Sequence, residues 1–120
     1  MATSADLKAE STKFNNTLEE LQFSSGLDVV ITDMDGKIKA SKLRYGRVEG
    51  IGSIILESLE KNRKISETFS TDRIEDFIVH GKKGYTVVKI TESNIFVISG
   101  LKEHQLGLAL YKLRQIAGNV

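Results

Sequence analysis

The strongest amphipathic pattern lies in the middle of the chain, at residues 47–60, with the sequence RVEGIGSIILESLE. On a helix with about 100° of rotation per residue, its apolar side chains spread over roughly 200° of the circumference. They are Val48, Ile51, Ile54, Ile55, Leu56 and Leu59. This arc is wider than contact with one sheet requires. We therefore predict that the helix packs on its own sheet and also against a second helix, for which its copy in another subunit is the simplest candidate. Gly52 lies inside the arc, where a close approach of another backbone explains a residue that costs up to about 1 kcal/mol in a helix.

Two further helices are predicted near the two ends of the chain. Residues 4–23 place Leu7, Phe14, Leu18 and Leu21 at helical spacing, and Ser24, Ser25 and Gly26 form a stop signal. Residues 103–117 form a second apolar stripe, and Gly118 is the expected stop. The middle helix is expected to end in the basic run at residues 61–64, because cations complement the negative end of the helix dipole.

Five short segments have the composition and alternation of strands. They are residues 27–33, 37–43, 73–80, 85–90 and 95–101. Asp35 and Gly36 predict a hairpin between the first two, and lysines on the second predict that it lies at a sheet edge, where charge discourages intermolecular pairing. The predicted fold is therefore α+β, in the order α-ββ-α-βββ-α, as one domain over residues 1–120. A five-stranded antiparallel sheet has the first and last helices on one face and the middle helix on the other.

Composition removes several classes of function. Seventeen Lys and Arg against sixteen Asp and Glu give a net charge of +1, so no strong field favours nucleic acid or a membrane surface. The absence of cysteine excludes a disulfide framework and a thiolate metal site. No window approaches the roughly 20 apolar residues of a membrane span, and the first residues are polar. We expect a cytoplasmic protein without a metal or other cofactor.

The segment Asp33-Met34-Asp35-Gly36 after an apolar strand is the best candidate for catalysis. It looks like the motif of the haloacid dehalogenase phosphatases, in which a strand delivers an aspartate nucleophile beside a magnesium ion. That motif continues with threonine, where this chain has Lys37, and its fold needs parallel strands with crossover helices. A hairpin turn is the preferred interpretation, and a magnesium-dependent phosphatase using Asp33 is the alternative.

Several short motifs in this order resemble the roadblock/dynein light chain family. They are the hairpin at Asp35-Gly36 followed by Ile38 and Ala40, the strand opening at Gly84-Tyr85, and the closing helix LGLALYKL from Leu106. The resemblance covers about residues 5–117. It implies a small α/β protein that forms a dimer with itself or with a paralogous roadblock protein and that regulates or scaffolds small Ras-like GTPases. Profilin-like and small-molecule-binding modules remain further alternatives, because they also cover sheets with helices.

The resemblance also implies roles for particular residues. In the family, the middle helix and third strand meet across a two-fold axis, and here that dimer interface would consist of Val48, Ile51, Gly52, Ile55, Leu59, Ile74, Phe77 and Val79. The polar side of the middle helix would lie near a docking surface for the GTPase. The predicted partner-binding residues are Arg44, Arg47, Glu49, Ser53, Glu57 and Lys61. No catalytic residue is implied.

Overall fold

The computed structural model describes residues 14–22, 26–44, 49–69 and 73–119, with side chains to residue 116. Its elements are a helix over residues 14–21, β1 (Asp28–Asp33), β2 (Ile38–Lys42), α2 (Ile51–Thr68), β3 (Asp76–Gly81), β4 (Gly84–Ile90), β5 (Asn94–Leu101), a short 3₁₀ helix (Glu103–Gln105) and α3 (Leu106–Asn119). The predicted order of elements is confirmed.

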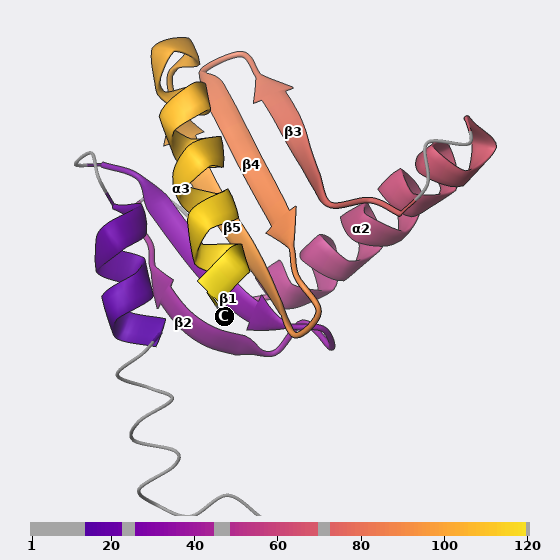
Figure 1. The fold of residues 1–120 in the computed structure, drawn as a ribbon, viewed down its shortest axis with the longest axis horizontal. Coiled ribbons are helices and arrows are strands. Elements are labelled where there is room, and N and C mark those ends of the chain that lie inside the picture. The colour runs from indigo at the N-terminus through magenta and orange to yellow at the C-terminus, as the bar shows by residue number, and fades with distance from the viewer. Residues whose placement is uncertain (1–13, 23–25, 45–48, 70–72, 120) are drawn as a thin grey trace, which may run out of the picture.

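The five strands form one antiparallel sheet with the order β2-β1-β5-β4-β3. The hairpin β1–β2 and the meander β3–β4–β5 meet where β1 pairs with β5 (Figure 1). β2 and β3 are therefore the two edges. The predicted edge position of the lysine-bearing strand is confirmed.

The two faces of the sheet carry separate cores, because alternate residues of each strand point to opposite sides. On one face the helix over residues 14–21 and α3 pack on β1, β4 and β5, with Leu21, Phe96 and Leu113 fully buried. On the other face Ile55 and Leu59 of α2 pack on Val30, Val88 and Ile95. The predicted division of two helices on one face and one on the other is confirmed (Figure 1).

The limits of α2 differ from the prediction at both ends. Glu49 and Gly50 form a turn before the helix, with Gly50 at φ +74°, so the helix begins at Ile51. It does not end in the basic run but continues to Thr68, because nothing there interrupts a helix and the charges pair along it. Lys61 Nζ lies 3.2 Å from Glu57 Oε1, and Arg63 Nη1 lies 3.0 Å from Glu60 Oε2. The far half of α2 consequently projects beyond the sheet (Figure 1).

Two other limits also differ. β3 begins at Asp76 rather than at residue 73, opposite the end of β4, whose last residue, Ile90, donates its amide to Glu75 O at 2.9 Å. At the other end of the chain, α3 continues through Gly118 to Asn119. A glycine lowers helix propensity without forcing a helix to end.

Candidate protein-interaction surface

One flank of α2 leaves large apolar side chains in contact with solvent. Ile54 is 63% exposed, Ile65 is 58% exposed and Phe69, which caps the helix, is 72% exposed. At about 100° per residue these three positions fall within about 60° of one another, beside the stripe that faces the sheet. We call Ile54, Ile65 and Phe69 the α2 flank. Ile65 and Phe69 are one turn apart, and Ile54 lies about three turns earlier, with the exposed Lys61 between them. Exposed apolar groups of this size are candidates for contact with another protein.

The edge strand β3 is the second apolar surface. Among the described residues it pairs with β4 alone, so no other described strand neighbours the backbone N–H and C=O groups on its outer side. Ile78 and Val79 point to opposite faces of the sheet and are 45% and 52% exposed. The other edge, β2, carries Lys39 and Lys42 instead. The lysines of β2 therefore discourage pairing with another strand, whereas the β3 edge permits it.

The α2 side of the sheet is only partly covered. α2 crosses the ends of the strands near the β1–β2 turn, and in the described part of the structure no helix lies over their other half (Figure 1). That half includes Val79, Thr86 and Ser99, which lie side by side in register, and the Thr86 and Ser99 hydroxyls hydrogen-bond at 2.8 Å. The uncovered face adjoins the β3 edge through Val79.

The predicted dimer residues lie in several environments. Gly52, Ile55 and Leu59 are buried in the chain's own structure, with Ile55 and Leu59 in the core beneath α2. Ile51, Ile74 and Phe77 are half-buried against that core, and Val79 is exposed. Val48 lies outside the described residues. The buried members cannot meet a second subunit through their side chains. The exposed large apolar groups of the described residues are the α2 flank, Ile78 and Val79 at the β3 edge, and Leu108 and Tyr111 on α3.

Gly52 does permit a close approach, but to the chain's own hairpin. A Cβ built on Gly52 would lie 2.0 Å from Gly36 O, in the turn between β1 and β2. Gly36 itself has φ +83°, which favours glycine. The predicted close backbone contact is confirmed, and its partner is the chain's own β1–β2 turn.

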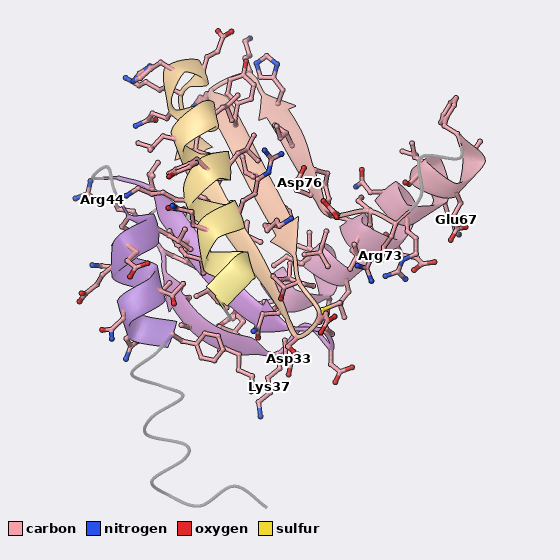
Figure 2. All side chains as sticks on the ribbon, viewed as in Figure 1. Asp33, Lys37, Arg44, Glu67, Arg73 and Asp76 are labelled. Carbon is pink, nitrogen blue, oxygen red and sulfur yellow. The ribbon has the colours of Figure 1, made fainter. Side chains whose placement is uncertain are left out.

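The predicted partner-binding residues separate into two groups. Glu49, Ser53, Glu57 and Lys61 are all exposed and follow one another along the polar side of α2 and the turn before it. Arg44 is also exposed, but it lies at the open end of the β1–β2 hairpin, where its amide donates to Asp28 Oδ1 and its side chain lies near Gly26, whereas α2 begins at the turn of that hairpin, with Gly52 against Gly36. Figure 2 shows Arg44 on the opposite side of the molecule from Glu67 and Arg73. Arg47 lies outside the described residues. The structure brings the α2 residues together and does not bring Arg44 to them.

Asp33 stabilises the hairpin turn. Its Oδ1 accepts hydrogen bonds from the amides of Asp35 and Lys37, each at 2.9 Å. The backbone hydrogen bond from Lys37 is the main cause of the lowered pKa of Asp33. Burial is the next largest influence and raises the pKa, and the amide of Asp35 and the charges of Lys39 and Lys37 lower it further. The neighbouring strands are antiparallel, so the crossover connections of the phosphatase fold are absent from the described sheet. The position and hydrogen bonds of this carboxylate support the hairpin interpretation.

The described residues offer little other candidate chemistry. No three His, Cys, Asp or Glu side chains come together there as a possible metal site. His80 stacks on Tyr85 with ring centroids 4.1 Å apart, as an aromatic pair across β3 and β4. No helix of the described chain is long and apolar enough to cross a membrane.

Sequence reasoning missed Ile65, Phe69 and Ile78 as candidates for contact. Ile65 and Phe69 follow the basic run at which the helix was expected to end, so they were not placed on α2. The available signal was the spacing of 11 residues between Ile54 and Ile65, which is about three helical turns and keeps both on one side. Ile78 alternates with the predicted Phe77 and Val79, and only its place on an edge strand exposes it.

Comparisons with known proteins give a match to solved structures only. No family model and no curated protein matches the sequence. A structure titled "MglB with tetrameric arrangement" is similar with a TM-score of 0.75 and 14% identity, over 92% of this chain and 92% of that chain. Myxococcus xanthus MglB gives 0.72 and 16%, over 98% and 88%. The Roadblock/LC7 domain from Streptomyces avermitilis gives 0.71 and 12%, over 86% and 89%. At these identities the likeness concerns the fold alone.

Proposed function

We propose that this chain, which has the fold of the roadblock/LC7 domains, is a non-enzymatic dimeric adaptor that binds a small Ras-like GTPase. The observation that carries the proposal is the apolar surface of the α2 flank and the β3 edge. A single subunit leaves both in water, and a second subunit would cover both. The likeness of the fold to MglB and Roadblock/LC7 structures supports the same assignment.

We propose that two copies dimerise through the exposed edge strand β3. Two copies related by a two-fold axis would pair β3 with β3 in antiparallel fashion, and each chain's unpaired backbone groups would become a ladder. The projecting half of α2 in one subunit would then lie toward the uncovered sheet face of the other. Ile65 and Phe69 would gain apolar contacts that their own chain does not supply. The partner in this arrangement is an identical chain or a paralogous roadblock protein.

The GTPase would dock on the polar side of α2, where Ser53 and Glu57 are exposed and turn away from the α2 flank, whereas Lys61 lies one turn before Ile65 and borders that flank. Glu57 and Lys61 form an exposed ion pair there, and such a pair contributes little stability, roughly 0–1 kcal/mol. Charges that contribute little to the fold are available for recognition. We propose that the adaptor orders the switch loops of the GTPase rather than inserting an arginine, because Arg44 lies against Asp28 and Gly26 at the open end of the hairpin and α2 begins at its turn. We place the complex in the cytoplasm.

A pull-down tests this proposal. Tagged protein is mixed with Ras-like GTPases from the same genome, loaded with GTP or with GDP, and GTP hydrolysis is then measured with and without the bound protein. We expect one GTPase to be retained in a nucleotide-dependent manner. The double variant Glu57→Lys with Lys61→Glu reverses both charges and should reduce retention at least several-fold, while Lys83→Glu on the β3–β4 turn should not. Equal retention of that GTPase by the double variant would place docking elsewhere, and retention of none would contradict the proposal.

A further inference from the structure

The edge strand β3 directs the backbone groups of alternate residues toward its open side. Its hairpin with β4 has a two-residue turn, so the pair that closes the turn, Gly81 with Gly84, is a hydrogen-bonded pair. At the other end of the strand the amide of Ile90 donates to Glu75 O at 2.9 Å, in the same alternation. The odd-numbered residues of β3 therefore bond to β4. The N–H and C=O groups that face the open side belong to Asp76, Ile78 and His80.

This alternation limits the ways in which two copies of β3 can pair. In an antiparallel ladder, residues whose N–H and C=O groups face the partner strand lie opposite one another. Asp76, Ile78 and His80 of one copy therefore lie opposite the same three residues of the other. With a two-fold axis between the strands, three registers pair at least two of these residues in each copy. They place the axis at Phe77, at Ile78 or at Val79.

The register with its axis at Ile78 uses the edge most fully. Ile78 then lies opposite its own copy and Asp76 lies opposite His80, so all three outward-facing residues of each strand are paired. An axis at Phe77 leaves His80 without a counterpart in β3, and an axis at Val79 leaves Asp76 without one. Those two registers also place the exposed Ile78 opposite a polar side chain. The axis at Ile78 instead places Ile78 opposite Ile78 and Val79 opposite Phe77.

This register also continues the apolar row beneath α2 into the second copy. Within one chain, four residues on that face of the sheet lie side by side and line the core under α2. They are Val30, Val97, Val88 and Phe77. Val79 of the second copy would follow Phe77 in this row, and Thr86 and Ser99 of that copy would follow Val79. The far half of α2 projects past β3 in the same direction, so it would lie over these residues of the second copy (Figure 1).

These three residues suit a covered position. Val79 is 52% exposed in one chain, so it gains from burial. The Thr86 and Ser99 hydroxyls already hydrogen-bond to each other at 2.8 Å, which lowers the cost of removing them from water.

We propose that the partner at the β3 edge is a second copy of this chain, paired in the register that has its two-fold axis at Ile78. An axis at one residue requires the same residue on both sides, which an identical chain supplies. This assignment rests on the proposed dimer and adds which chain forms it and which residues meet.

Disulfide mapping tests the register. Opposite residues of an antiparallel pair have Cα atoms about 4.5–5.5 Å apart, within the range of a disulfide, and residues displaced by two positions are about 7–8 Å apart. Ile78→Cys should therefore cross-link on its own under mild oxidation. Phe77→Cys and Val79→Cys should each stay unlinked alone and form a linked heterodimer when the two are mixed, which a tag on one of them identifies by mass.

Opposite charges at the axis supply a test that needs no cysteine. Ile78 is 45% exposed, so Ile78→Lys and Ile78→Glu should stay folded by circular dichroism. Each should dimerise at least several-fold more weakly than the wild type, because like charges meet across the axis, and an equal mixture should restore the dimer in native mass spectrometry. Leu108→Lys and Leu108→Glu on α3 are the matched controls, since Leu108 is 46% exposed, and they should dimerise like the wild type, alone or mixed.

Two outcomes overturn this register while a dimer through β3 stands. In the first, Phe77→Cys or Val79→Cys cross-links alone and Ile78→Cys does not. In the second, the wild type is a dimer, but the mixture of Ile78→Lys and Ile78→Glu dimerises no better than either variant. A monomeric wild type without a cross-link in any β3 sample overturns the proposed dimer of identical chains as well.

Discussion

Two glycines, Gly36 and Gly52, fix the hairpin turn against α2. The carbonyl of Gly36 occupies the space where a side chain of residue 52 would begin. α2 can therefore approach the turn closely enough for Leu56 to contact Gly36, and a Cβ on Gly36 would lie 3.0 Å from Leu56 Cδ1. A glycine that looks unfavourable from helix propensity is required by packing.

This contact predicts opposite effects for two glycine substitutions in helices. Gly52→Ala should lower the free energy of unfolding by about 1–3 kcal/mol, because the new methyl group forces α2 and the hairpin apart. Gly107→Ala in α3 is the matched control, since the space around Gly107 is open, and it should raise stability by up to about 1 kcal/mol. Urea unfolding followed by circular dichroism measures both. Stabilisation by Gly52→Ala would show that the close contact does not exist in solution.

Asp33 gives a prediction for the dependence of stability on pH. Its pKa in the folded chain is lowered from 3.8 by the hydrogen bonds of the turn, so the folded state favours the charged carboxylate. That stabilisation is fully present above the unfolded pKa and is lost as the pH falls through the folded pKa. Asp33→Asn should flatten the loss of stability below about pH 4 relative to the wild type. If urea unfolding gives the same dependence of stability on pH for Asp33→Asn and the wild type, Asp33 does not stabilise the folded state in this way.

At the scale of elements, α2 and β3 each expose apolar side chains that the described chain does not cover. α2 has a buried stripe and an apolar flank on neighbouring sides. Ile54 belongs to the flank, and the next residue, Ile55, belongs to the buried stripe. Of the apolar arc that the pattern predicted, Ile54 is the one described member that is exposed, and Ile65 and Phe69 lie beyond that arc. The pattern could not assign single residues to the inside or the outside, because the rotation of the helix is set by the contact of Gly52 with Gly36.

Neighbouring substitutions on α2 separate the two roles. Ile55→Glu places an unpaired carboxylate in the core and should cost about 3 kcal/mol or more, so that circular dichroism shows loss of structure. Ile54→Glu changes a side chain that is 63% exposed and should leave the chain folded but weaken the dimer in light scattering. A folded, fully dimeric Ile54→Glu would move the interface away from the α2 flank.

At the scale of the molecule, the sequence predicted the fold well, because each element has its own local signal. Asp35-Gly36 marked the hairpin, the lysines marked β2 as an edge, and the apolar stripes placed the helices. The candidate surface was less accessible to such reasoning. Ile65 and Ile78 are exposed only because α2 runs past the sheet and β3 lies at its edge, and both facts depend on the assembled sheet.

The central claim is that a second copy covers the β3 edge, and cysteine cross-linking tests it most directly, because the natural sequence contains no cysteine. Single cysteines are introduced in turn at Phe77, Ile78, Val79 and His80, with Lys39 on the β2 edge and Leu108 on α3 as exposed controls. After mild oxidation, the mass should double from 13.3 kDa for at least one β3 variant, whose paired residue lies near the two-fold axis, and for neither control. No cross-link at any β3 position, or equal cross-linking at Lys39 and Leu108, would contradict this dimer.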